Sequence, residues 1–398
     1  MDAKSAKESI AASVESLSEE MTRIAQLIHA KPELGFQEFY ASGLHTEFLE
    51  KHGFKVEREL LGMKTAYRAT FSKGEGPKVA LLAEFDALPK LGHACGHNLF
   101  GMASCGAAVA LSRVMQKGTV CVFGTPAEEG TVPNASAKAP MAKAGLFDEF
   151  DAVMIGHAEG RNILRLELIS RALIEMDFIG KPAHAAGSPE LGRNALDAAS
   201  LALMGINSLR QHFTKDVRVH GIMSDGGSAV NTIPDFAQLR FGMRAKEPQT
   251  LDDVVARVLN CCECCAKALD CEFKYRPIAN TAYTVRHNMT LLGAVAKNLD
   301  LLGAEYVETE KSSYTTDVGN VSYRAPAIHP YFSIGRPGLP GHTEEFAVAS
   351  NSPAGFKGMI LCAKTLAMTA FDVLEDDALR AAVRAEFESN DTGWNSKN

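Results

Sequence analysis

The chain has 398 residues, of which 46% are hydrophobic and 22% are charged, so it has the composition of an ordinary globular protein with room for two compact units. Its formal net charge of −7 and its lack of any run of Lys or Arg give no electrostatic reason to expect nucleic acid or an anionic membrane as a partner. Small molecules are therefore the expected partners.

The N-terminal segment and the cysteines indicate an intracellular chain. Residues 1–20 mix both charge signs without an apolar block, so they fit neither a secretory signal nor a membrane anchor. No later stretch reaches the roughly 18 apolar residues that a membrane helix needs. Nine cysteines is an odd number, and a chain of this size folds without disulfides. We expect reduced thiols, a cytoplasmic location and no membrane contact.

Helices are predicted at the start of the chain, over residues 15–31 and 40–52, because apolar residues recur there every three or four positions. Short apolar runs then predict strands, and a stretch of small residues at 100–115 predicts a helix between the first two. The predicted strands are residues 79–83, 119–123 and 152–155. This alternation is typical of parallel strands covered by helices.

A second unit is predicted from about Ser170 to Ala282, where the pattern changes to half-exposed, alternating strands around two helical runs. The first pattern then returns until a closing helix at 353–369, and residues 389–398 form a polar tail. We therefore predict an α/β protein with a mixed, mostly parallel sheet flanked by helices. Its catalytic domain is expected in two parts, 1–169 and 283–398, with a smaller α+β domain inserted at 170–282.

Residues that bind metals or move protons follow each predicted strand of the first domain. They are Glu84, Asp86, Cys95 and His97 after the first strand, Glu128 and Glu129 after the second, and His157 after the third. Ligands of open α/β sheets gather at the carboxyl ends of the strands, so we expect these side chains to share one cleft. Thiolate and imidazole are strong ligands for zinc and similar ions.

Five residues are predicted to hold two divalent metal ions: Cys95, His97, Glu129, His157 and a late His342 in a glycine-rich loop. Five ligands are too few for two closed tetrahedra unless one is shared, and a thiolate has lone pairs enough to bridge two ions. Sharing leaves a position open for water, as catalysis requires. Zinc and manganese are expected first, with cobalt and nickel as alternatives, because all four accept this mixed donor set.

The adjacent glutamates are expected to divide the work. On an extended segment neighbouring side chains point in different directions, so both cannot bind the same metal well. Glu129 is therefore the predicted ligand, and Glu128 the base that takes the proton of a water bridging the metals. Asp86 is expected to accept a hydrogen bond from His97 and fix its imidazole.

Two other functions remain open at this point. Cys95 activated by His97 describes a cysteine-nucleophile hydrolase, which a chelator would leave active. A non-catalytic, metal-stabilised dimer that binds a small acid is the other alternative, and an assay over N-acyl amino acids and dipeptides distinguishes it from an enzyme.

Six motifs occur in order along the chain: AEFDALPKLGHACGHN, TPAEEG, IGHA, GKPAHAA, NTIP and GHTEEF. Over almost the whole chain they resemble the dinuclear metallopeptidase family of aminoacylases, glutamate-releasing carboxypeptidases and auxin-conjugate amidohydrolases. The cysteine-containing branch is the closer match, and residues 314–335 look like its p-aminobenzoyl-glutamate hydrolase and dipeptidase members. Asn98 and Ala158 depart from the pattern, since many relatives carry Asp and a larger apolar residue there, which puts the substrate in doubt.

The resemblance implies a metal-dependent hydrolase that cleaves the amide bond of an N-acyl amino acid or a dipeptide. It implies the same five metal ligands, with Cys95 as the bridge, and Glu128 as the general base. It also implies a homodimer formed by the smaller domain. His184 would stabilise the oxyanion in the partner's active site, Asn231 would lie in the same region, and Arg244 would face the substrate carboxylate.

Overall fold

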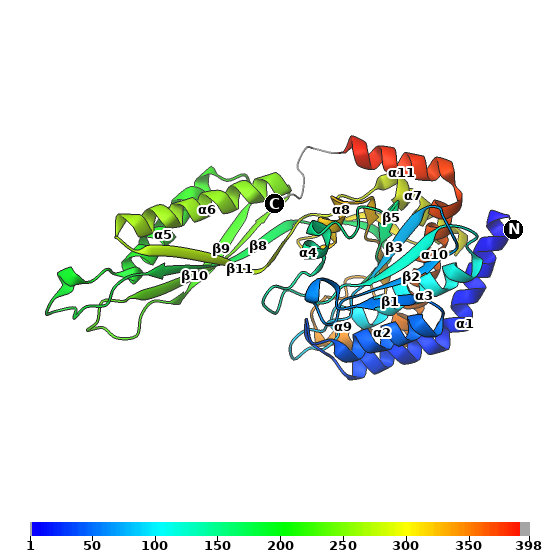
Figure 1. The fold of residues 1–398 in the computed structure, drawn as a ribbon, viewed down its shortest axis with the longest axis horizontal. Helices are drawn as coiled ribbons and strands as arrows, with labels where there is room; N and C mark the ends of the chain where they lie inside the picture. The colour runs from blue at the N-terminus through cyan, green and yellow to red at the C-terminus, as the bar shows by residue number, and fades with distance from the viewer. Residues whose placement is uncertain (1, 391–398) are drawn as a thin grey trace. The chain divides into compact units, whose positions relative to one another are not determined.

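The computed structural model describes residues 2–390, so most of the polar tail predicted at 389–398 lies outside the described residues. The chain divides into two compact units (Figure 1). Unit 1 comprises Met1–Glu167 and Val285–Asn398, and unit 2 comprises Leu168–Thr284. Unit 2 is thus inserted into the chain of unit 1. None of the described helices combines the length and apolar character that crossing a bilayer requires.

Unit 1 opens with a longer helix than predicted. Helix α1 spans Ala3–Ala30, and Asp2 caps it because its carboxylate accepts the backbone N–H of Ser5 at 2.8 Å. The periodic stripe that it buries includes Ala6, Ile10, Val14, Leu17, Met21, Ile24 and Ile28. The prediction started at residue 15 because the first turns bury only small or isolated apolar residues. Helix α2 follows at Phe39–Lys51.

A six-stranded mixed sheet forms the centre of unit 1, with the order β1-β2-β4-β3-β5-β13. Its strands are β1 (Lys55–Arg58), β2 (Tyr67–Ser72), β3 (Lys78–Ala83), β4 (Thr119–Gly124), β5 (Ala152–Met154) and β13 (Ala327–Ile328). The four strands from β4 to β13 run parallel, while β1 and β2 are antiparallel at one edge. The parallel strands are almost wholly buried, which explains their continuous apolar runs.

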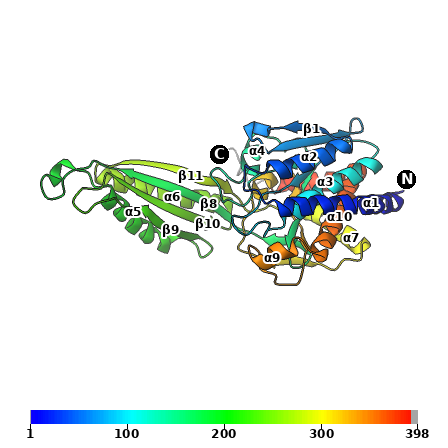
Figure 2. The ribbon, with the colours of Figure 1, turned by 90° about the horizontal axis from the view of Figure 1, so that it is seen from below.

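Helix α3 (His97–Val114) lies against β3 and β4, and α1 and α10 (Pro353–Glu375) pack on it (Figure 2). Its small residues allow this close packing. A Cβ on Gly101 would lie 2.1 Å from the carbonyl oxygen of Glu84, and one on Gly106 would lie 2.5 Å from the sulfur of Met21. The run of small residues therefore lets the first turns of α3, which begins at His97, pack against the chain at the end of β3.

A second sheet in unit 1 has the order β12-β7-β14-β6. Its strands are β6 (His157–Glu159), β7 (Ile163–Glu167), β12 (Val307–Lys311) and β14 (Tyr331–Ser333). The remaining helices of unit 1 are α4 (Lys138–Lys143), α7 (Met289–Leu301), α8 (Val318–Ser322), α9 (Glu344–Ala349) and α11 (Asp377–Ser389). Helices α4 and α8 contact each other, which brings Lys138 toward the residues before α8.

Unit 2 is an antiparallel sheet with two helices on one face. The strand order is β11-β8-β10-β9, with β8 (Ser170–Ile179), β9 (Arg218–Asp225), β10 (Phe236–Ala245) and β11 (Glu272–Ala282). Helices α5 (Ala195–Leu209) and α6 (Pro248–Ala268) pack on it. In β8 the buried Ala172, Ile174 and Met176 alternate with half-buried or charged residues, as expected for a sheet covered on one face.

Candidate metal centre

The five predicted metal ligands come together in unit 1 as two groups that share one sulfur. The first group is Cys95, His97 and His157, and the second is Cys95, Glu129 and His342. Within each group, one ligand atom of each residue lies within 4.8 Å of the other two. Sγ of Cys95 is 3.4 Å from Nε2 of His157, and Oε2 of Glu129 is 3.3 Å from Nε2 of His342.

Glycine and strand ends explain why these side chains converge. Gly96 caps α3 with a φ of 80°, and a Cβ on it would lie 2.5 Å from that of Ala158. The small Ala158 that departs from the family pattern is therefore the neighbour that a tightly approaching Gly96 requires. His157 is the first residue of β6, so its backbone is fixed by pairing with Tyr331.

Hydrogen bonds orient the ring nitrogens toward a shared centre. Nδ1 of His97 lies 2.9 Å from Oδ1 of Asp86, which leaves Nε2 as the ring atom with a lone pair to offer. Nδ1 of His157 lies 2.9 Å from the carbonyl oxygen of Ala158, with the same consequence. The predicted contact between Asp86 and His97 is thus present, and Oδ2 of Asp86 also accepts the backbone N–H of Glu129 at 3.1 Å.

The donor set fits a pair of divalent cations. Nε2 of His97 and Oε1 of Glu129 are buried and have no hydrogen-bond partner among the described residues. Buried polar atoms are normally satisfied, so these atoms call for a ligand that is not a protein group. The thiolate, two imidazoles and a carboxylate supply the donors that zinc and similar ions prefer. His342 completes the set from a left-handed backbone position with a φ of 58°, where its N–H donates to Ala94 at 3.0 Å.

Glu128 also reaches this centre, but not by the conformation that we predicted. The segment after β4 is a turn, in which Ala127 has a φ of 56°, and it is not extended. Glu128, Glu129 and His97 each place a ligand atom within 4.8 Å of the others, so the expectation that the two carboxylates diverge was wrong. Burial, followed by the charges of Glu84 and Glu129, raises the pKa of Glu128 well above its usual value.

Three further charged residues lie beside Glu128. Glu84 and Asp317 place an oxygen within 4.8 Å of it and of each other, and Lys138 pairs with both acids. Glu84 is one of the acids that directly follow the first predicted strand. Asp317 belongs to the segment 314–335 that carried the family resemblance. Lys138 was missed, because a single lysine among small residues gives no signal in the sequence.

The other three predicted site residues lie in unit 2. His184 is exposed, and its Nδ1 accepts the backbone N–H groups of Ala186 and Gly187 at 3.2 and 3.0 Å. Asn231 is exposed on the neighbouring segment, where its carbonyl accepts the N–H of Ala185 at 3.0 Å. His184 and Asn231 are therefore neighbours through this short backbone pairing.

Arg244 lies elsewhere in unit 2, on the central strand β10. It is half-buried and stands opposite Arg171 of β8 and Arg218 of β9 in the strand register. Burial, with a smaller contribution from the Arg171 charge, lowers the pKa of Arg244. Residues directly opposite each other share one face of a sheet, so three arginines line this face.

Comparisons with known proteins match both units. A model for the peptidase dimerisation domain of M20 enzymes matches residues 169–264, within unit 2. The chain is 36% identical to the Xaa-Arg dipeptidase of Mus musculus, over 94% of this chain and 90% of that protein. This chain belongs to the M20 peptidase family. The family and enzyme class predicted from the motifs, a metal-dependent hydrolase of amide bonds, are thereby confirmed.

Other members of the M20 family are similar along the same length. One of the subunits of p-aminobenzoyl-glutamate hydrolase from Escherichia coli is 29% identical, over 94% of this chain and 93% of the relative. A dinuclear metal-binding M20 peptidase from Bacillus subtilis has the same fold, with a TM-score of 0.64 and 21% identity over 91% of this chain and 99% of that one. An aminobenzoyl-glutamate utilization protein from Klebsiella pneumoniae superposes with a TM-score of 0.72 and 20% identity, covering 91% and 98%.

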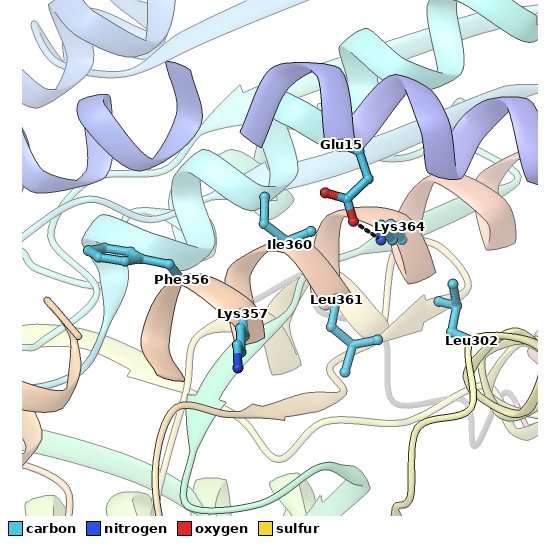
Figure 3. Close-up of a pocket in the computed structure, with 7 residues that line it drawn as sticks. All are labelled: Glu15, Leu302, Phe356, Lys357, Ile360, Leu361 and Lys364. Atoms are coloured by element: carbon cyan, nitrogen blue, oxygen red, sulfur yellow. Dashed lines mark hydrogen bonds and ion pairs between the residues drawn. The ribbon is translucent and has the colours of Figure 1, made fainter. Parts of the chain in front are cut away.

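A separate pocket lies between α1 and α10 (Figure 3), and it contains none of the predicted site residues. An ion pair between Glu15 and Lys364 crosses it. Its lining residues are Glu15, Leu302, Phe356, Lys357, Ile360, Leu361 and Lys364. None of these lining residues belongs to the ligand groups of the candidate metal centre.

Proposed function

We propose that this M20 enzyme hydrolyses the amide bond of an N-acyl amino acid or a dipeptide with two divalent metal ions. The observation that supports this most strongly is Cys95, whose sulfur belongs to both ligand groups. A shared thiolate would hold two cations in one site and would leave each with room for reactants. Zinc and manganese suit these donors, as do cobalt and nickel, and elemental analysis of the purified protein distinguishes them.

Glu128 is the proposed general base. When bound, the metal ions supply Lewis acidity to the attacking water and to the substrate carbonyl. Glu128 takes a proton from that water as the new C–O bond forms, and then gives it to the nitrogen as the C–N bond breaks. Desolvation and the neighbouring acids raise the pKa of Glu128, which supports this role because a carboxylate with a raised pKa is a better proton acceptor.

The proposed substrate carries a free carboxylate on its amine side. Relatives are named for Xaa-Arg dipeptides and for p-aminobenzoyl-glutamate. Arg244 supports an anionic substrate, because a guanidinium group can bind a carboxylate through two parallel hydrogen bonds, and Arg171 and Arg218 stand opposite it in the strand register. Arg171 and Arg218 would contribute to the same positive face, and Arg244 would bind the carboxylate directly.

We further propose a homodimer in which His184 and Asn231 serve the active site of the partner. The match of unit 2 to a dimerisation domain supports the dimer. Unit 2 also exposes apolar side chains, Leu201 and Met204 on α5 and Ile222 on the edge strand β9, with 41%, 68% and 61% of their surfaces accessible. Exposed apolar side chains and an edge strand are both suited to contact with a second copy of the chain.

Mixing two inactive variants tests whether His184 acts across the dimer. Dimers formed from Glu128→Gln and His184→Ala chains contain one site with an intact base and an intact partner histidine. We expect about a quarter of the wild-type rate after mixing, since half of the dimers are mixed and each has one working site. If His184 served its own chain, mixing would restore nothing.

The function itself is tested by turnover of Xaa-Arg dipeptides, p-aminobenzoyl-glutamate and N-acyl amino acids, with and without a chelator. Loss of turnover on chelation and its return with added metal are expected. A cysteine-nucleophile hydrolase would keep its rate, but burial and the Glu129 charge raise the pKa of the Cys95 thiol, which opposes that chemistry. Glu128→Gln should bind two metal ions and lose roughly 10²- to 10⁴-fold in kcat, and retained activity would refute the assignment of the base.

We also propose that the enzyme works in the cytoplasm. All nine cysteines are free thiols, and five of them fall within Cys261–Cys271. A reducing compartment preserves such thiols, whereas an oxidising one pairs them. Localisation of the tagged protein tests this directly.

A further inference from the structure

Lys138 is a fully buried cation beside the candidate metal centre. Its side chain has 0% exposure, and Nζ lies 2.7 Å from Oε1 of Glu84 and 2.6 Å from Oδ1 of Asp317. Its backbone N–H also donates to Oδ2 of Asp317, at 2.9 Å. Burial alone would lower the pKa of Lys138, but the charges of Asp317 and Glu84 outweigh it and raise the pKa. The ammonium group is therefore a permanent charge.

The acids that Lys138 binds also face the metal ligands and the base. Oε2 of Glu84 lies 3.5 Å from Nε2 of His97. Glu84, Glu128 and Asp317 each place an oxygen within 4.8 Å of the other two. Three carboxylates at this spacing are a set that holds divalent cations in other proteins. Here the cation among them is the ammonium group of Lys138.

We propose that Lys138 is a positioning residue: by holding Glu84 and Asp317 it keeps both carboxylates from ligating the metal ions, and so leaves Glu128 available to move protons. This inference rests on the proposed function, because it assumes metal ions at the ligand groups that contain His97. Without the ammonium, three acids lose their internal counter-charge. Their most favourable partners are then the neighbouring metal ions, so these ions are held more tightly while the base is drawn away from its task.

Lys138→Met tests this, since it keeps the length of the side chain and removes the charge. Chelator competition should show the metal ions held at least roughly 10-fold more tightly than in the wild type. The absorption spectrum of the cobalt-substituted protein should change, because carboxylate oxygens join the coordination. We expect kcat to fall roughly 10²-fold while KM changes little, as for loss of a positioned base.

Lys7→Met is the matched control. Nζ of Lys7 lies 2.8 Å from both Oδ2 of Asp372 and Oδ1 of Asn298, in the same unit but in no group with the metal ligands. This variant should keep the wild-type metal affinity, cobalt spectrum and kcat. If Lys138→Met and Lys7→Met behave alike in these three measurements, the inference is overturned.

A second variant guards against a simple failure to fold, since removing one partner of a buried ion pair is strongly destabilising. Lys138→Met combined with Asp317→Asn removes an acid together with the lysine, while Glu84 is still released. A purely structural role for Lys138 requires that this folded double variant regain wild-type metal affinity and cobalt spectrum, which would refute positioning. Continued tight binding and an altered spectrum support it. Neither readout needs substrate, so a wild type that cleaves no amide would overturn the proposed function alone.

Discussion

Asp86 accepts one hydrogen bond from each ligand group of the candidate metal centre. Oδ1 lies 2.9 Å from Nδ1 of His97, and Oδ2 accepts the backbone N–H of Glu129 at 3.1 Å. Asp86→Asn keeps the shape but turns one oxygen into an NH2 donor. If the NH2 group faces Glu129, it meets the backbone N–H of Glu129, which is also a donor. If the NH2 group faces His97, it forces the imidazole proton onto Nε2, the atom that would bind metal. With metal on Nε2, either orientation therefore loses one buried hydrogen bond, which costs about 1–3 kcal/mol and predicts a loss of roughly 10- to 100-fold in metal affinity.

Metal affinity is measured by chelator competition, and folding by thermal unfolding of the metal-free proteins. Asp151→Asn is the control, because Oδ2 of Asp151 accepts the backbone N–H of Lys78 at 2.8 Å, at the first residue of β3 and away from the ligands. It should bind metal like the wild type. If folded Asp86→Asn binds metal as tightly as this control, the reasoning that one carboxylate orients both ligand groups is refuted.

Three more predictions follow from single residues. Cys95→Ala should reduce the bound metal from two ions to less than one per chain, as measured by elemental analysis. Cys105→Ala, which changes a buried cysteine outside the ligand groups, should retain both ions. Two bound ions in each variant would exclude a shared sulfur. Burial, reinforced by the Asp86 charge, raises the pKa of Glu38 from 4.5 to about 7. The folded chain therefore binds the Glu38 proton more tightly than the unfolded chain, and the free energy of unfolding falls as the pH rises between these two values. Glu38→Gln should make this fall roughly 3 kcal/mol smaller in urea unfolding, and an identical pH dependence of the two proteins would contradict the prediction. Met204→Asp, which places a charge on the exposed face of α5, should yield monomers by light scattering, and an unchanged dimer would exclude this face.

The architecture of unit 1 could be predicted because its strands are buried on both faces. Parallel strands read as uninterrupted apolar runs, and β3, β4 and β5 are such runs. The start of α1 could not be predicted, since its first turns contribute only small apolar residues to a stripe that the tertiary contacts with α3 bury. The short strands β6 and β13 also escape sequence patterns, because two or three residues carry no periodicity.

The convergence of the proposed ligands could be predicted from residue type and from their positions after strands, but the local geometry of the proposed base could not. Ala127 adopts a left-handed φ of 56°, which an alanine rarely does, so nothing in the sequence indicates that Glu128 and Glu129 lie in a turn. A residue distant in the sequence stabilises that turn, since the N–H of Ala127 donates to the carboxylate of the buried Glu38 at 2.9 Å. A contact across 89 residues of sequence therefore fixes the direction of the base.

The converging acids give this centre a need for cations beyond catalysis, because their negative charges must be balanced. Glu84, Glu128 and Asp317 converge around a single buried lysine, and Glu129 lies next to them in the ligand group with His97. Burying carboxylates without enough positive charge is unfavourable, and the raised pKa of Glu128 expresses that cost. Lys138 offsets part of it wherever metal is absent, and two divalent ions would offset the rest. The same local excess of negative charge thus accounts for metal binding, for a base that can hold a proton, and for a lysine without access to solvent.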